Sequence, residues 1–267
     1  MKILVTGGTG YVGKEVVAHL LKKHKIVVLS RKKRVADYET RQGNIADYND
    51  VKNAVRGCDA VIHLAVESRH SASREQHHRT TVLGTENVIR ASIEEGVKII
   101  VNMSSSAVLS TTETNYTWAK KRAEEVVKKY QNKITIVSLR PSSIYDLERI
   151  LQTKRAARFP LPKLKTRFRP IFRTTLVECI EKALKKKKSK IYGVGDKQPI
   201  SLVNFIKAAA APKKPFFFPA FLIKPAGLFP RFKFLVEDKV FKTDMKELGV
   251  KPQDTLEVIR REKQKAG

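Results

Sequence analysis

Residues 2–24 read KILVTGGTGYVGKEVVAHLLKKH, and this stretch decides the fold. Its first five residues form an apolar, β-branched run that predicts a buried strand, and apolar residues recur at helical spacing in its second half. Between these parts, Gly7, Gly10 and Gly13 form a GxxGxxG pattern. Such glycines permit a tight turn and let backbone N–H groups approach a pyrophosphate at the helix N-terminus. The stretch therefore predicts the start of a dinucleotide-binding half, whose binding loop also contains Thr9, Tyr11 and Val12.

The alternation of strands and helices continues through the first half of the chain. Apolar runs predict four more strands, at 26–29, 60–65, 97–105 and 134–142. Amphipathic segments predict helices at 47–56, 82–96 and 115–130, and residues 67–80 are polar. Several of the strands are apolar throughout, which is typical of a parallel sheet covered on both faces. The sequence therefore predicts an α/β fold with a Rossmann-like, doubly wound parallel sheet.

Beyond residue 146 the regular alternation weakens, and Lys, Arg, Phe and Pro become frequent. Helices are expected at 174–188, at 200–211 and from about Asp254, with a short strand at 190–195. Residues 215–236 hold four prolines and seven phenylalanines, so one regular helix is not expected there. We expect a dinucleotide-binding domain at 1–145 and a small substrate-covering C-terminal part at 146–267, of which 173–193 returns to the sheet.

Length and composition exclude several classes of protein. A chain of 267 residues with 42% hydrophobic residues can fold around one core or two unequal lobes. Its two cysteines cannot form a disulfide scaffold, and no CxxC or HExxH spacing indicates a metal site. His70, His77 and His78 form no convincing ligand set, and we expect them on a solvated face. Because no signal peptide and no 18-residue apolar run is found, a cytoplasmic protein is expected.

The charge is high and unevenly distributed. The chain carries 54 Lys and Arg against 26 Asp and Glu, a net charge of +28, of which +19 falls within 151–267. This excess predicts that the second part docks on an anionic membrane surface or an acidic protein, which would place the protein at the inner face of a membrane. In the alternative, the phenylalanines of 215–236 cover the substrate pocket or pack on the sheet. Specific nucleic-acid binding is not expected, because no helix-turn-helix, zinc-finger or RNP motif occurs.

The end of the second strand indicates which nicotinamide dinucleotide is bound. An acidic residue there would accept hydrogen bonds from a free ribose 2′-hydroxyl. The sequence is instead Ser30-Arg31-Lys32-Lys33-Arg34. Cations without a carboxylate suit a 2′-phosphate, although basic residues are common throughout this chain. We therefore favour NADP(H) over NAD(H), with Ser30 and Arg31 among the binding residues.

Tyr116 and Lys120 lie four residues apart at the start of a predicted helix, so they share one face. Three serines, Ser104 to Ser106, precede them at the end of a predicted strand. A nearby ammonium can lower the pKa of a phenol and hold the nicotinamide ribose, while a serine hydroxyl orients a substrate carbonyl or hydroxyl. Because the YxxxK spacing follows a strand that ends in three serines, in a chain that begins with GxxGxxG, it is a specific signal.

These motifs together resemble the NAD-dependent epimerase/dehydratase group of extended or atypical short-chain dehydrogenases/reductases. The resemblance is carried, in chain order, by VTGGTGYVG, GNIADYNDVKNAVRGCDAVIHLA, GTENVIRASIEEGVKIIVNMSSSAV, YTWAKKRAEE, LRPSSIY and IYGVGDKQPISLVNFI. The chain departs from the group's pattern in four places. VLS at 108–110 replaces VYG, Thr81 replaces the usual Asn before GT, and Asp146 replaces a common Gly. The loop from Ser105 to Tyr116 is also shorter than in typical nucleotide-sugar enzymes of the group, which removes part of the wall that contacts substrate.

The resemblance implies a role for each matching residue. Tyr116 would be the acid/base, Lys120 its partner and cofactor ligand, and Ser105 the substrate-orienting hydroxyl, with Ser106 a close second. The remaining matches concern the cofactor: Asn44 and Ile45 on its adenine side, and His63, Leu64 and Ala65 in the loop along it. Packing in the strand is the alternative role for His63.

The function implied is that of an NADP-dependent oxidoreductase, epimerase or dehydratase acting on a carbonyl or carbinol. The substrate would be a nucleotide sugar or another small molecule, and a homodimer is one assembly compatible with the group. The alternative is a non-catalytic NADP(H)-binding protein, similar to the 39-kDa accessory subunit of respiratory complex I.

Overall fold

The computed structural model describes residues 1–32, 37–69, 71–164, 166–219, 238 and 240–266. The chain forms two compact units. Unit 1 consists of Met1–Val108, Glu113–Arg140 and Val177–Tyr192, and unit 2 of Leu109–Thr112, Pro141–Leu176 and Gly193–Gly267. The functional division predicted from the sequence, 1–145 and 146–267, stays a prediction.

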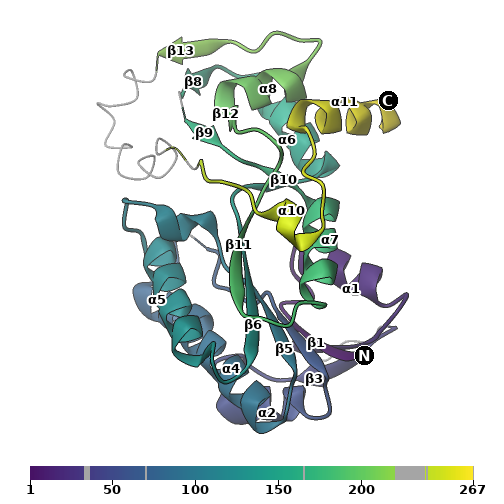
Figure 1. The fold of residues 1–267 in the computed structure, drawn as a ribbon. Coiled ribbons are helices and arrows are strands. Elements are labelled where there is room, and N and C mark those ends of the chain that lie inside the picture. The colour runs from purple at the N-terminus through teal and green to yellow at the C-terminus, as the bar shows by residue number, and fades with distance from the viewer. Residues whose placement is uncertain (33–36, 70, 165, 220–237, 239, 267) are drawn as a thin grey trace. The chain divides into compact units, whose positions relative to one another are not determined.

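A single sheet forms the centre of unit 1 (Figure 1). Its strands are β1 (Lys2–Thr6), β2 (Lys25–Ser30), β3 (Glu39–Gln42), β4 (Ala60–His63), β5 (Ile99–Met103), β6 (Thr135–Pro141) and β11 (Lys190–Val194). They lie in the order β11-β6-β5-β4-β1-β2-β3, and the pairs from β6 to β3 are parallel. The strand order reverses between β1 and β4, which defines a doubly wound sheet. The predicted fold class is confirmed, with seven strands in the sheet where the motifs of the first half indicated five.

Helices cover both faces of this sheet. They are α1 (Gly13–Leu20), α2 (Tyr48–Val55), α3 (Arg74–His77), the π-helix η1 (His78–Leu83), α4 (Gly84–Glu94), the 3-10 turn η2 (Ser106–Leu109), α5 (Asn115–Tyr130) and α7 (Arg173–Ala183). One face packs on α2, α4 and α5 through a core that includes Leu4, Val55, Ile89, Ile100 and Val127. On the other face α1 meets α7, where the Glu181 carboxylate accepts from His19 Nε2 at 2.7 Å and from Lys23 Nζ at 2.8 Å (Figure 1).

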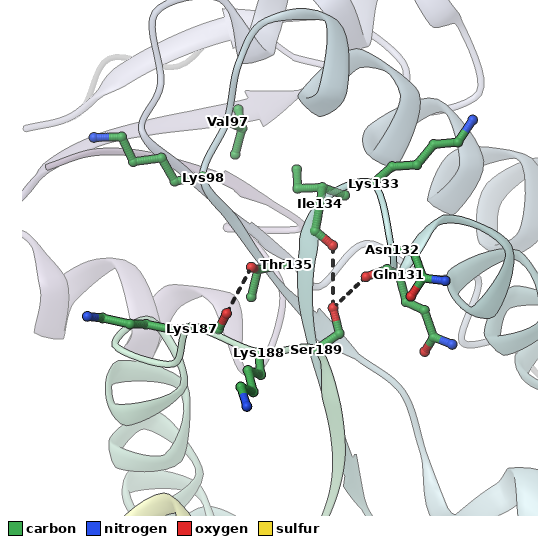
Figure 2. Close-up of a pocket in the computed structure, with 10 residues that line it drawn as sticks. All are labelled: Val97, Lys98, Gln131, Asn132, Lys133, Ile134, Thr135, Lys187, Lys188 and Ser189. Carbon is green, nitrogen blue, oxygen red and sulfur yellow. Dashed lines mark hydrogen bonds between the residues drawn. The ribbon is translucent and has the colours of Figure 1, made fainter.

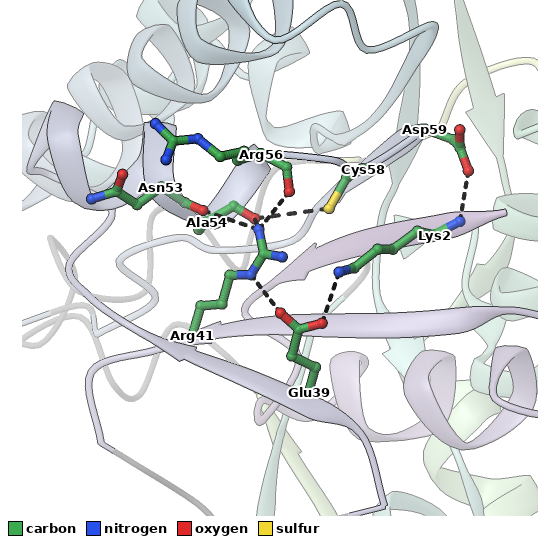
Figure 3. A network of polar contacts seen from close by, with 8 residues as sticks. All are labelled: Lys2, Glu39, Arg41, Asn53, Ala54, Arg56, Cys58 and Asp59. Atoms are coloured by element: carbon green, nitrogen blue, oxygen red, sulfur yellow. Dashed lines mark hydrogen bonds and ion pairs between the residues drawn. The ribbon is translucent and has the colours of Figure 1, made fainter.

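The edge strand β3 was not expected, because its sequence, ETRQ, is polar. Figure 3 shows why it forms. Arg41 Nη1 donates to the backbone oxygens of Asn53, Ala54 and Arg56 at 2.7–3.0 Å, and these carbonyls end α2. A guanidinium satisfies the carbonyls that a helix C-terminus leaves unpaired. Glu39 holds Arg41 Nε at 2.7 Å, so charged side chains fix the strand at the sheet edge.

Unit 2 is built from short elements. They are β7 (Ile144–Tyr145), α6 (Leu147–Ala156), β8 (Leu161–Lys163), β9 (Arg167–Phe168), β10 (Ile171–Phe172), β12 (Ile200–Ser201), α8 (Leu202–Ala210), β13 (Phe217–Pro219), α10 (Met245–Leu248) and α11 (Thr255–Lys265). In the described part of unit 2 the strands form three two-stranded sheets, and an aromatic core includes Tyr145, Phe168, Phe172 and Phe205. The helix expected from Asp254 is confirmed as α11, which the Asp254 carboxylate caps.

One element of unit 2, the helix α6, has a local cause that the sequence pattern did not reveal. Asp146 caps α6 by accepting from the Arg149 N–H at 2.9 Å, and it pairs with Arg173 Nη1 at 2.6 Å. The unexpected Asp of the LRPSSIYD segment thus begins a helix. The Phe/Pro stretch contributes β13, whereas its residues from 220 onward, including Lys224, Arg231 and Lys233, lie outside the described residues. Over the described ranges, no helix is long and apolar enough to cross a membrane.

Candidate active site

The parallel register brings the ends of several strands to one edge of the sheet. Thr6 of β1 pairs with His63 of β4, and His63 pairs with Asn102 of β5. The loops that follow these strands therefore meet at the carboxyl edge, where ligands of open α/β sheets bind. They contain the glycine pattern, Leu64 and Ala65, and the three serines.

The glycine loop is tightly closed. Gly7 has φ +70°, and its carbonyl accepts the N–H of Gly10 at 2.9 Å. A Cβ atom on Gly13 would lie 2.1 Å from the Gly7 oxygen, and one on Gly7 would lie 2.8 Å from the Ala65 nitrogen. Gly10 differs because it is exposed, and a Cβ there would meet only the Gly7 oxygen, at 3.2 Å. Gly7 and Gly13 thus determine the shape of the loop. Gly10 leaves the surface of the loop open, so that backbone groups of the loop can contact a ligand.

Other residues of this loop flank the start of α1. Thr9, Tyr11 and Val12 are half-buried, and Val12 occupies the N-cap position of α1 without a side-chain cap. The Lys14 N–H at the start of α1 donates to the Gly10 carbonyl at 3.1 Å, so backbone and no side chain of Val12 joins the helix start to the loop.

The residues expected on the adenine side lie after β2 and β3. Ser30 is half-buried and its hydroxyl accepts from the Lys32 N–H at 3.3 Å, while Arg31 is exposed. Lys33 and Arg34 lie outside the described residues. Asn44 is exposed, and its side chain accepts from the Ala46 N–H at 3.1 Å. Ile45 is anchored from α4, because Asn87 donates to its carbonyl at 3.1 Å.

His63 lies at the end of β4 and is only 3% exposed. Its Nδ1 atom is 2.8 Å from the Thr6 hydroxyl, and its Nε2 atom is 3.0 Å from the Thr85 hydroxyl. Burial, together with the charge of Lys120, lowers the pKa of His63 to about 3, so the ring is neutral. Leu64 and Ala65 follow it, and both donate backbone N–H bonds to Thr6. His63 therefore holds together the two strands that carry the loops of the site.

Ser105, Tyr116 and Lys120 come together where β5 meets the start of α5. A capping box at Thr114 and Thr117 starts α5 one residue before Tyr116. The Tyr116 hydroxyl shares a side-chain hydrogen bond with Ser105, and Lys120 Nζ donates to the Met103 carbonyl at 2.7 Å. Burial raises the pKa of Tyr116 above its ordinary value, and the bond to Ser105 offsets part of this rise. The lowered phenol pKa expected from the sequence is therefore wrong for this arrangement, in which the Lys120 ammonium is directed to a backbone oxygen.

His77 is a residue that sequence reasoning misplaced. The expectation of a solvated face is wrong, because His77 is 1% exposed and its ring lies edge-on to Tyr116 with centroids 6.3 Å apart. His78 is exposed and leans on Trp118, and His70 lies outside the described residues. A short helix, α3, turns one side of the polar 67–80 stretch inward. Its start signal was the capping box between Ser73 and Gln76.

A cavity of about 700 Å³ lies at the opposite edge of the sheet (Figure 2). It lies at the amino ends of β5, β6 and β11 and is lined by Lys98, Lys133, Lys187 and Lys188 among others. In Figure 2 Lys98 and Lys187 extend to one side, Lys133 to the other and Lys188 downward, so the four ammonium groups do not converge on one point. Cations are favourable here because α5 and α7 end near this loop cluster with their negative dipole ends.

Comparisons with known proteins agree with this fold. A reductase of Stenotrophomonas maltophilia, 2-alkyl-3-oxoalkanoate reductase, is 34% identical over 113 residues, which is 40% of this chain and 34% of the reductase. UDP-glucose 4-epimerase of Thermotoga maritima, solved with UDP-glucose, superposes with a TM-score of 0.80 at 18% identity, covering 100% of this chain and 99% of that one. The Bordetella bronchiseptica enzyme WbmG, solved in complex with NAD, gives a TM-score of 0.80 at 19% identity, covering 100% and 95%. These two likenesses show the fold.

The curated relatives are longer than the part that matches. The chain spans between 30% and 52% of their lengths. The model of the NAD dependent epimerase/dehydratase family matches residues 3–148, which include the glycine loop, Ser105, Tyr116 and Lys120. Since this match extends over more than half of the chain, the protein belongs to the NAD-dependent epimerase/dehydratase family.

Proposed function

We propose that this protein is an NADP-dependent oxidoreductase or epimerase that acts on a secondary hydroxyl or carbonyl group of a small molecule. The observation that carries the proposal is the contact of Tyr116 with Ser105 beside the buried Lys120, at the same sheet edge as the glycine loop. Family membership supports it, and so do two relatives, one named as a 2-alkyl-3-oxoalkanoate reductase and one as a 4-epimerase.

The residues at the sheet edge fit a dinucleotide. Gly7 and Gly13 occupy positions where a Cβ would collide with backbone, so the loop has the close-packed form that lets N–H groups face a pyrophosphate. Gly10 keeps that surface bare, and α1 begins directly behind it. The loop would hold the pyrophosphate, Asn44 and Ile45 the adenine, and Lys120 the nicotinamide ribose. When bound, the nicotinamide supplies the capacity to accept or donate a hydride.

The chain's own groups would handle the proton. Ser105 orients the substrate oxygen, and Tyr116 takes or returns its proton at the phenol oxygen. Because burial raises the pKa of Tyr116, the phenol is protonated in the structure and suited to donate to a substrate carbonyl. A protonated Lys120 would favour the phenolate when the reaction runs toward oxidation. The contact of Ser105 with Tyr116 supports Ser105 over Ser106 as the orienting hydroxyl.

Two finer choices complete the proposal. NADP(H) is favoured because the exposed Arg31 follows β2 and the segment 30–34 contains no carboxylate. Nucleotide sugars are the first substrates to examine, because the Thermotoga maritima epimerase of the same fold was solved with UDP-glucose.

The proposal is tested by turnover. Wild-type protein is incubated with NADP(H) or NAD(H) and a panel of UDP-sugars and small ketones, and absorbance at 340 nm and epimer formation are followed. We expect Tyr116→Phe to lower turnover roughly 10²-fold while cofactor binding is kept, because general acid catalysis is worth about that much. Lys120→Ala should weaken both turnover and cofactor binding. Tyr130→Phe, at the far end of α5 where the hydroxyl donates to Glu86, is the matched control.

Two results would contradict the proposal. A Tyr116→Phe enzyme with unchanged turnover would remove Tyr116 from the reaction. Cofactor binding without turnover of any substrate in the panel would favour the non-catalytic alternative.

A further inference from the structure

Lys120 belongs to a buried polar cluster that joins α5 to β5 and β6. Its side chain crosses to the Met103 carbonyl at the end of β5, and the residue is 6% exposed. One helical turn further, Glu124 lies on the same face of α5 and is 5% exposed. A lysine and a carboxylate at this spacing and depth interact more strongly than an exposed pair, because little water screens them.

The carboxylate of Glu124 is fixed on both of its oxygens. Ser104 Oγ donates to Oε1 at 2.5 Å, and Arg140 Nε donates to the same oxygen at 2.7 Å. A second Arg140 nitrogen, Nη2, donates to Oε2, which completes a bidentate pair. Since Ser104 and Arg140 belong to the β5 end and to β6, both carboxylate oxygens are fixed one helical turn from Lys120, whose pKa the charge of Glu124 raises.

Among the described residues, charged or titratable groups of α5, β4 and β6 surround this part of the site, and His77 of α3 lies edge-on to Tyr116. Glu124 and Tyr116 lie on α5 with Lys120, His63 comes from β4, and Arg140 comes from β6. Burial lowers the pKa of Lys120 to about 8, and the charge of Glu124 acts in the opposite direction. His63 is neutral above about pH 3, and Tyr116 is protonated. The balance of charge at Lys120 therefore depends on Glu124 and on the arginine that partly neutralises it.

We propose that Glu124 is a positioning residue for Lys120: its carboxylate, clamped by Arg140 and Ser104, keeps the Lys120 ammonium charged and aligned at the end of β5. Arg140 has two opposed effects, because it holds the carboxylate in place and weakens its field. The assignment concerns the ionisation of Lys120, and only its consequence for cofactor binding rests on the proposed function.

The decisive experiment measures the ionisation of Lys120 in two variants. Lysine is labelled with 13C at Cε, and the Lys120 resonance is identified by its loss in Lys120→Arg and followed over a pH titration. Glu124→Gln removes the negative charge, so the pKa of Lys120 should fall by at least one unit. Arg140→Gln removes the neutralising cation, so the pKa should rise. A merely structural role would disturb both variants alike and would not give shifts of opposite sign.

An exposed pair on the same helix provides the matched control. Arg122 Nη1 lies 2.8 Å from Glu125 Oε2, with both side chains more than half exposed. Arg122→Gln and Glu125→Gln make the same charge changes on α5, and neither should move the Lys120 titration by more than a few tenths of a unit. Glu124→Asp should restore part of the wild-type value. If Glu124→Gln does not fold, Ser104→Ala loosens the carboxylate without removing its charge and should give a smaller fall.

Cofactor binding is the second measurement. The pH at which NADPH affinity is half lost should move down in Glu124→Gln and up in Arg140→Gln, in step with the Lys120 titration. Shifts of the same sign in both variants, or no shift in either, would overturn the inference. If NADPH does not bind at all, the proposed function fails, and the titration still decides the role of Glu124.

Discussion

The hydroxyl of Thr6 donates a hydrogen bond to Nδ1 of His63, and this bond joins the ends of two adjacent parallel strands. The direction follows from the neighbouring contacts. Thr85 Oγ1 donates to the Thr81 carbonyl at 2.6 Å, so it must accept from Nε2 of the histidine. Nδ1 then carries no proton. The ring is fixed as the neutral Nε2–H tautomer, between the strand that precedes the glycine loop and the first turn of α4.

A buried neutral His63 makes stability fall in acid. The pKa of His63 is about 3 in the folded chain against 6.5 ordinarily, so the folded state binds fewer protons between these values. The contribution of neutral His63 to the free energy of unfolding is complete above pH 6.5. It is lost as pH falls toward 3, at about 1.4 kcal/mol per pH unit. Between pH 6.5 and 5, wild type should lose about 2 kcal/mol more than His63→Asn in urea unfolding. Equal losses in the two proteins would contradict the assignment.

Gly13 and Gly10 should respond differently to alanine. A methyl group at Gly13 would lie 2.1 Å from the Gly7 oxygen, so Gly13→Ala should cost about 1–3 kcal/mol of unfolding free energy. At Gly10 the same group meets one atom at 3.2 Å, so stability should change little. Gly10→Ala should still weaken dinucleotide binding, because the methyl group covers the exposed surface of the loop. Thermal unfolding and cofactor fluorescence separate the two effects, and full cofactor affinity in Gly10→Ala would argue against binding there.

Arg31 should decide between the two dinucleotides. Arg31→Ala is expected to weaken NADP(H) about 10- to 100-fold, the range for one charged hydrogen bond to phosphate, and to leave NAD(H) unchanged. Arg260→Ala removes another exposed guanidinium, from α11, and serves as the control. Titration of both dinucleotides by fluorescence gives the ratio directly. Equal affinities of wild type for NADP(H) and NAD(H) would refute the preference.

Asp196 makes unit 2 respond to pH in the opposite sense. This fully buried carboxylate accepts from the hydroxyls of Tyr145 and Thr255, both at 2.8 Å, and burial raises its pKa from 3.8 to about 6. The folded state therefore binds more protons, and stability is lost as pH rises from 3.8 to about 6. Asp196→Asn removes this loss, so its stability relative to wild type should rise by about 3 kcal/mol over that interval. The free energies of unfolding of both proteins are measured at pH 4, 5 and 6.5. A difference between them that does not change with pH would show that Asp196 does not cause this pH dependence.

The sequence by itself determined the nucleotide-binding half of the fold. The β-branched strands, the glycine spacing and the capping signals are local, and each predicts its element without knowledge of the rest. The helix predicted at 115–130 has those bounds in the structure, because the Thr114 cap and a continuous amphipathic pattern agree. The YxxxK spacing placed Tyr116 and Lys120 on one face of it for the same reason.

Tertiary structure decided what depends on partners distant in sequence. The polar strand β3 forms because Arg41 reaches the end of α2, and His77 is buried because α3 packs beside α5, and neither contact leaves a periodic pattern. The pKa values of His63, Tyr116 and Lys120 likewise depend on burial and on which groups face them. A sequence gives the identity and spacing of these side chains, but the electrostatic field at each one is set by the packing around it.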